Sequence, residues 1–317
     1  MGTNTAPRVI AGALMLALSG GVLCAADGPR VAFGAGVLRR DGVIIPFAAF
    51  DGKRWSNTWP MPSLELTIPI DVRGIPSKWW GPTAALDSWQ VWTGGEAKPV
   101  RVVQPDWVNV YCVRQIGLRS DYAPALPAPP RLEQPYPKDG LAVSPPQPVE
   151  RIDVVPIESL EIRPLIPAVH QAFNAAERKV DEVYGHPVSR RAREGRTPDI
   201  DAVYAFGSHP RIYYVESVRR YRLLGQIDAD CTATAFGTGW FAREGEEVRS
   251  LETAVDVLPC NRAGASFMLP LGVMRLAGRL FWLAQFSGFD HERYVIVEIK
   301  PKTVKAVLSV WGGSCSR

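Results

Sequence analysis

Residues 272–288 read GVMRLAGRLFWLAQFSG, and residues 36–52, near the other end of the chain, read GVLRRDGVIIPFAAFDG. Aligned without gaps, the two stretches are identical at seven of seventeen positions, including Arg39 with Arg275 and Gly42 with Gly278. Each stretch reads as a strand, a tight turn at its central glycine, and a second strand whose consecutive apolar residues suit burial on both faces. The repeated hairpin therefore predicts a mainly β architecture.

The β pattern continues through most of the chain. Glycine and proline each occur 28 times, which suits many short strands joined by turns better than a helical protein. Residues 267–311 read as four strands in succession, an antiparallel meander the size of one β-propeller blade. We expect a mainly β protein built from antiparallel four-stranded meanders. A propeller-like ring is one arrangement that would accommodate them, and a pair of β domains is another.

One inserted α-helix is expected at about residues 165–184. Apolar side chains recur there at steps of three and four residues, as at Leu165, Val169 and Phe173, which gives one apolar stripe suited to packing on a sheet. Gly185 ends the pattern, and Glu177 belongs to the polar face.

A proline-rich segment divides the chain. Residues 123–150 contain nine prolines, which favour extended, polyproline-like conformations, so we expect no interior strand in this segment. We interpret this segment as a linker or crossover between an N-terminal β unit, residues 27–122, and a C-terminal β unit, residues 151–317, that carries the helix.

The first 26 residues read as a secretory signal peptide. Arg8 precedes an uncharged stretch at residues 9–23, and small residues follow up to a cleavage site near Ala26. Lipidation of Cys24 is an alternative, although Leu23 stands where a small residue is usual. No later stretch approaches the ~18 apolar residues of a transmembrane helix. We therefore expect a protein exported to the periplasm or the extracellular space.

Cleavage would leave four cysteines, which in an exported chain predict two disulfides. Residues 231–243 and 247–260 read as hairpin arms turning at Gly245, and a register of i + j = 491 sets Cys231 opposite Cys260. Cys112 would then pair with Cys315. Four buried free thiols are the alternative.

Motifs for chemistry are weak. The four histidines, among them His291, lie at no metal-ligand spacing with another histidine or a cysteine, so no metal and no cofactor are expected. There is no G-x-S-x-G motif. The pair His291 and Glu292 reads as a solvated loop pair, and residues 237–239 (GTG) as a bulge in a long hairpin. A formal net charge of +4 is too small to favour nucleic acid.

Two clusters of charge remain. Asp199 with Asp201, and Asp228 with Asp230, could be turn residues, calcium ligands or the carboxylates of a glycoside hydrolase. Residues 189–198 carry four arginines and read as an exposed basic loop.

Tryptophan density is the most suggestive functional feature. Seven of the ten tryptophans fall between residues 55 and 107. Exposed indole rings offer flat faces to sugars, prolines or cations, whereas packing between sheets is the structural alternative. The candidate binding residues are Trp79, Trp80, Trp89 and Trp92.

Because no nucleophile is identifiable, the sequence favours a non-enzymatic role. We expect an exported, disulfide-stabilised binding or scaffold protein of the periplasm or cell envelope that acts on a protein or glycan surface. The alternative is a secreted carbohydrate-active hydrolase that uses paired carboxylates and exposed tryptophans.

Overall fold

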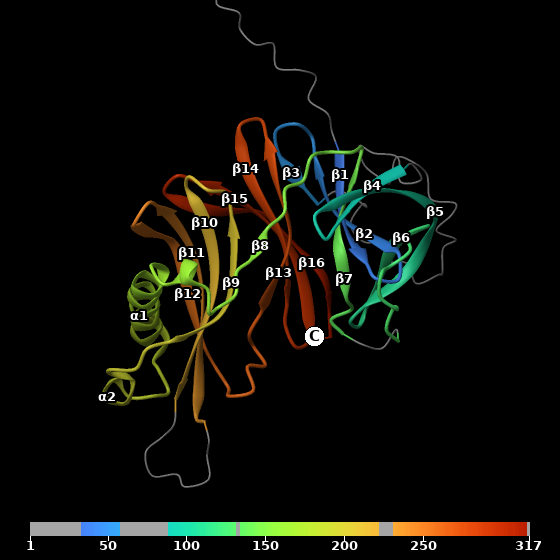
Figure 1. The fold of residues 1–317 in the computed structure, drawn as a ribbon. Helices are drawn as coiled ribbons and strands as arrows, with labels where there is room; N and C mark the ends of the chain where they lie inside the picture. The colour runs from blue at the N-terminus through green and yellow to red at the C-terminus, as the bar shows by residue number, and fades with distance from the viewer. Residues whose placement is uncertain (1–32, 58–87, 131–133, 222–230, 316–317) are drawn as a thin grey trace, which may run out of the picture. The chain divides into compact units, whose positions relative to one another are not determined.

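Three β assemblies and one long helix make up the described part of the computed structural model, which covers residues 33–57, 88–130, 134–221 and 231–315 (Figure 1). The first assembly comprises β1 (Phe33–Arg39), β2 (Val43–Phe50), β3 (Trp55–Ser56), β4 (Ser88–Thr93), β5 (Glu96–Val110), β6 (Val113–Ser120) and β7 (Lys138–Ser144). Six of these strands form a closed barrel in the order β1-β7-β4-β5-β6-β2, because β1 also pairs with β2. β3 extends the sheet beyond β2.

The second assembly is a four-stranded antiparallel sheet, here called the central sheet. It runs in sequence order through β13 (Phe267–Leu276), β14 (Arg279–Ser287), β15 (His291–Lys300) and β16 (Thr303–Ser314). These strands confirm the meander expected at residues 267–311. The described strands form this meander, a second sheet whose strands also follow one another in sequence order, and a barrel, and not a ring of repeated four-stranded blades.

The third assembly is a five-stranded antiparallel sheet. Its order is β12 (Glu247–Leu258), β11 (Ala233–Glu244), β10 (Arg211–Tyr221), β9 (Asp199–Phe206) and β8 (Asp153–Val154). A 3-10 helix (Leu160–Ile162) leads into α1 (Leu165–Tyr184), and the short α2 (Arg190–Arg193) follows. Figure 1 shows α1 lying against β11 and β12.

The central sheet is buried on both faces. On one face Phe281, Leu283 and Tyr294 share a core with Val37 and Ile45 of the barrel. On the other face Trp282 and its neighbours pack against the five-stranded sheet, and the rings of Trp240 and Trp282 lie 5.0 Å apart. This double burial explains why residues 279–287 lack the polar alternation of a surface strand.

The barrel hairpin has the same property for the same reason. Val37 and Ile45 face the central sheet, whereas Leu38 and Ile44 belong to a separate core of barrel residues that includes Trp89 and Leu118. The two similar hairpins therefore contribute to one shared core, in which Phe50 and Phe281 lie 6.2 Å apart.

Helix α1 confirms the expectation for residues 165–184. Leu165 and Val169 pack on Val203 and Tyr213 of the five-stranded sheet. Further along the helix, the ring of Phe173 lies where a side chain on Gly237 would be, 2.5 Å from an ideal Cβ. Gly237 of the GTG motif is thus part of a helix-packing surface. The bulge in this hairpin lies between Trp240 and Phe241, just beyond the motif.

The proline-rich segment contains an interior strand, contrary to the expectation from its proline content. β7 lies between β1 and β4 in the closed barrel. Its residues, KDGLAVS, form a proline-free stretch between Pro137 and Pro145. The prolines therefore delimit the strand instead of preventing it.

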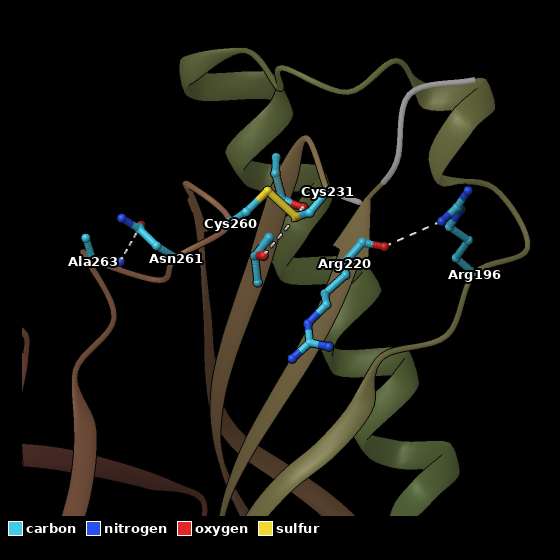
Figure 2. Close-up of a disulfide and its surroundings, with 8 residues drawn as sticks. Arg196, Arg220, Cys231, Cys260, Asn261 and Ala263 are labelled. Carbon is cyan, nitrogen blue, oxygen red and sulfur yellow. Dashed lines mark hydrogen bonds between the residues drawn. A yellow bond between two sulfur atoms is a disulfide. The ribbon is translucent and has the colours of Figure 1, made fainter. Parts of the chain in front are cut away.

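Two disulfides are present, Cys112–Cys315 and Cys231–Cys260. Near its turn the β11–β12 hairpin has the expected register, with Glu244 opposite Glu247, and the bulge shifts the register by one residue further on. Cys231 and Cys260 lie just beyond the strand ends (Figure 2). Cys112, between β5 and β6, joins the barrel to the residue after β16.

Candidate ligand-binding cleft

A cleft of about 760 Å³ lies where one end of the five-stranded sheet meets one end of the central sheet. Its walls come from the β9–β10 turn, the arms of the β13–β14 turn, the end of β15 and the crossing segment that precedes β8. A volume of this size is typical of small-molecule and peptide side-chain sites.

The floor of the cleft is apolar. Phe206, Ile212 and Ala242 are buried members of the core between the two sheets, and Leu280 and Ile299 pack against that core. The cleft is therefore the place where the core between the sheets reaches the surface. An apolar group of a ligand bound there would pack directly against that core.

The rim is charged and has an excess of bases. Five basic side chains and three acidic side chains line it: Arg151, Arg211, Arg249, Arg275 and Lys300, with Glu150, Asp153 and Glu244. With His209 neutral, the lining residues have a net charge of +2. Such a rim favours an anionic ligand, and the attraction weakens as salt is added.

Two rim arginines are held in place by carboxylates. Arg211 lies 3.1 Å from Asp153 and 2.5 Å from Glu161. Burial opposes the charge on Arg211, but the hydrogen bonds to these carboxylates outweigh it and raise its pKa. Arg275 lies 2.9 Å from Glu150, and its guanidinium carbon lies 5.3 Å from the ring centroid of Phe206.

A third arginine connects the two sheets. Arg249 of β12 donates a hydrogen bond of 2.8 Å to the carbonyl of Pro301, in the β15–β16 turn. The cleft is thus framed by side chains from both sheets. Sequence reasoning missed it because the charged residues of the rim lie as far apart in sequence as Glu150 and Lys300, and no local motif connects them.

The structure describes two of the four tryptophans of the predicted platform. Trp79 and Trp80 fall outside the described residues. Trp89 is 1 % exposed inside the barrel, so its ring cannot meet a ligand at the surface. Trp92 is half-buried and lines a separate cavity of about 380 Å³. Neither of the two described candidates lines the cleft itself, although the cavity at Trp92 shares Glu150 and Arg151 with it.

The predicted carboxylate pairs do not converge on the cleft within the described residues. Asp199 and Asp201 are exposed at the start of β9, and Asp201 forms an ion pair of 2.8 Å with Arg262. Asp228 and Asp230 fall outside the described residues. In the part of the chain that the structure describes, no group of three or more His, Cys, Asp or Glu side chains could hold a metal ion.

The pair His291 and Glu292 is not a solvated loop pair, because β15 begins at His291 and its alternation turns Glu292 inward. Glu292 is fully buried, 2.9 Å from the Nζ of buried Lys138, and it accepts a hydrogen bond of 2.5 Å from the hydroxyl of Tyr294. Burial lowers the pKa of Lys138 and raises that of Tyr294. Lys138 lies in the segment interpreted as a linker, so the pairing was not foreseeable.

Two further charged residues were placed wrongly at the surface. Glu177, on the expected polar face of the helix, is buried and forms an ion pair of 2.7 Å with Arg219. Arg193, in the expected basic loop, is buried in α2 and paired with Asp181, whereas Arg190 and Arg191 are exposed. Burial of a charge becomes tolerable when it is paired and hydrogen-bonded.

Comparison with known proteins gives no match: no family model, no curated protein and no solved structure resembles this chain significantly. The candidate function therefore rests on the geometry described above.

Proposed function

We propose that the chain is an exported, disulfide-stabilised binding protein, and that the cleft between the two sheets takes an acidic segment of another protein of the periplasm or cell envelope. The observation that carries this proposal is the combination of an apolar floor with a rim of net charge +2. An apolar side chain of the partner would occupy the floor while its carboxylates met the rim arginines.

Export is supported by the two disulfides, since such bonds persist in oxidising compartments and are rare in the cytosol. No helix in the described part of the chain is long and apolar enough to cross a membrane.

A protein partner suits this cleft better than a neutral glycan. Sugars stack on exposed aromatic faces, but Phe206, the aromatic residue in the lining, is 6 % exposed and lies beneath Arg275. Two of the three rim carboxylates, Glu150 and Asp153, are bound by arginines. These two carboxylates hold the rim arginines in place. That role suits a binding site more than a site of acid–base chemistry.

The experiment is a fluorescence anisotropy titration with the disulfides intact. The probes are labelled peptides in which Leu or Phe is flanked by Asp and Glu, the same peptides with Lys in place of the acids, and a neutral oligosaccharide. We expect saturable binding of the acidic peptides alone, weakening between low and high salt.

The double variant Arg249→Glu, Arg275→Glu should lose at least about tenfold in affinity. Arg191→Glu is the matched control, because Arg191 is exposed on α2, which packs near Tyr221 at the far end of β10. Absence of saturable binding to any acidic peptide, or an equal loss in the control, would refute the proposal.

A further inference from the structure

Three side chains at the other end of the central sheet form a hydrogen-bonded row. The Oγ of Ser266 lies 3.0 Å from the Nε2 of His291, and the Nδ1 of His291 lies 2.8 Å from the Oδ1 of Asp290. Ser266 immediately precedes β13, and the other two residues lie where β14 gives way to β15. The nine residues of β14 separate this row from the cleft by about 30 Å.

The direction of the hydrogen bonds follows from the donor and acceptor properties of the groups. An ionised carboxylate only accepts, so Asp290 requires a proton on Nδ1 of His291. In the neutral imidazole Nε2 is then an unprotonated acceptor, and the hydroxyl of Ser266 must donate to it. This is the arrangement in which a histidine can remove the proton of a serine nucleophile.

The imidazole is seated by its surroundings. A side chain on Gly288 would meet the His291 ring at 2.4 Å from an ideal Cβ, so the ring rests directly on this glycine. The carbonyl of Gly288 accepts a hydrogen bond of 3.0 Å from the hydroxyl of Tyr111, and the carbonyl of Asp290 accepts one of 2.7 Å from the amide of Cys315.

Both disulfides constrain segments that lead to the row. Tyr111 precedes Cys112 in the chain, so the Cys112–Cys315 disulfide fixes both residues, Tyr111 and Cys315, that hydrogen-bond to the β14–β15 connection. Cys231–Cys260 anchors the start of the loop that leads to Ser266. Figure 2 shows this disulfide with Asn261, whose side chain accepts a hydrogen bond of 3.1 Å from the amide of Ala263. The serine and the histidine are thus presented from loops that are braced at their ends.

Exposed aromatic side chains accompany the row. Phe289, next to Asp290, is 82 % exposed, and Trp311 is 66 % exposed with its ring 5.3 Å from the His291 ring. Both rings are free to contact an apolar ligand at the surface. Here they would receive the acyl or aryl part of a substrate.

We propose that Ser266 and His291 are catalytic residues of an esterase activity toward apolar esters, with Asp290 as the residue that positions the imidazole. The Oγ of Ser266 attacks the ester carbonyl carbon while its proton passes to Nε2 of His291. The bond to the alcohol breaks, and the alcohol leaves with that proton. Water then attacks the acyl group on Ser266 and gives its proton to His291. The carboxylic acid departs as the proton returns to Ser266.

The test is covalent labelling with an alkyl fluorophosphonate, in which the serine oxygen replaces fluoride on phosphorus. Mass spectrometry of proteolytic peptides should find the phosphonate on Ser266 of the wild type. Hydrolysis of p-nitrophenyl butyrate should fall at least about 100-fold in Ser266→Ala and in His291→Gln.

Ser309→Ala is the matched control, because Ser309 is exposed on β16 opposite Val295 and should keep wild-type labelling and rate. Peptide mapping without reductant verifies both disulfides in every variant. A wild-type protein without phosphonate on Ser266, or a Ser266→Ala variant that hydrolyses the ester at the wild-type rate, would overturn the proposal. Peptide binding at the cleft is measured separately and does not depend on either outcome.

Discussion

Arg39 and Arg275 occupy the same position in the two similar hairpins but have opposite environments. The side chain of Arg39 is 5 % exposed and that of Arg275 is 60 % exposed. Arg39 makes two hydrogen bonds to Asp41, a third to the carbonyl of Asn109, and lies 4.1 Å from the ring centroid of Tyr136. Arg275 has a carboxylate partner, Glu150, at the rim of the cleft.

The neighbouring strands explain the difference. β1 is paired on both sides, with β2 and with β7, so that Arg39 lies opposite Lys138. β13 is the edge strand of the central sheet, and among the described residues the backbone pairing on its outer side is a single bridge between Val273 and Glu150. Similar sequences therefore form similar hairpins. Whether the arginine is buried or exposed depends on whether another strand pairs with the outer side of its hairpin, as β7 does with β1.

The largest expected effect concerns the link between the two hairpin-bearing assemblies. Cys112–Cys315 spans 203 residues of sequence and Cys231–Cys260 spans 29. Loop-closure entropy predicts that removing the longer link with Cys112→Ser, Cys315→Ser costs about 5 kcal/mol, against about 3.5 kcal/mol for the shorter one. Urea denaturation of both double variants measures the difference, and a larger loss for the Cys231–Cys260 pair would contradict the ranking.

The buried pair beside Arg39 comes next. Lys138→Ala would leave Glu292 fully buried without its cation, which should cost about 3–5 kcal/mol of unfolding free energy. The combined variant Lys138→Met, Glu292→Leu should recover most of this loss, because it removes both charges. Lys305→Ala, on the exposed side of β16, is the control and should change stability by less than about 0.5 kcal/mol. Urea denaturation of all three variants should show these losses, and a Lys138→Ala variant as stable as the control would contradict the prediction.

A buried carboxyl between the five-stranded sheet and the central sheet should make stability depend on pH. Burial raises the pKa of Glu216 to about 7, an effect that the hydrogen bond from the amide of Met268 partly offsets. Asp201 raises that pKa further and Arg262 lowers it.

The folded state thus holds this proton more tightly than the unfolded chain does. Stability should fall as pH rises from about 4.5 to about 7, by about 3 kcal/mol. Glu216→Gln should abolish this part of the pH dependence. Denaturant titrations at pH 5 and pH 8 test it, and identical pH dependence in wild type and variant would show that Glu216 does not titrate there.

Features that depend on a local sequence pattern could be predicted from the sequence. Double-sided apolar strands, the helix stripe at Leu165 and Val169, and the turn register near Gly245 all follow from periodicities that burial imposes. The features that it missed depend on which distant segments meet. Lys138 reaches Glu292 across 154 positions, and Ser266 reaches His291 across 25.

Proline content misled the interpretation of residues 123–150 because an average over the segment hid seven proline-free residues of β7. The candidate sites also could not be predicted from local sequence patterns, because they join segments that are distant in sequence. The rim of the cleft joins a crossing segment, two turns and two sheets, and a serine is a candidate nucleophile only once an imidazole is known to adjoin it.

The paired arginines provide the most direct test of the central claim, that the neighbouring strands bury the arginine of one hairpin and leave that of the other exposed at the rim of the cleft. The measurement is the unfolding free energy of Arg39→Ala and Arg275→Ala, determined side by side in urea. We expect a loss of about 3 kcal/mol for Arg39→Ala, because Asp41 would lose its cation and buried Tyr136 would lose the guanidinium that packs on its ring. Arg275→Ala should lose less than about 1 kcal/mol. Equal losses, or a larger loss at Arg275, would contradict the account.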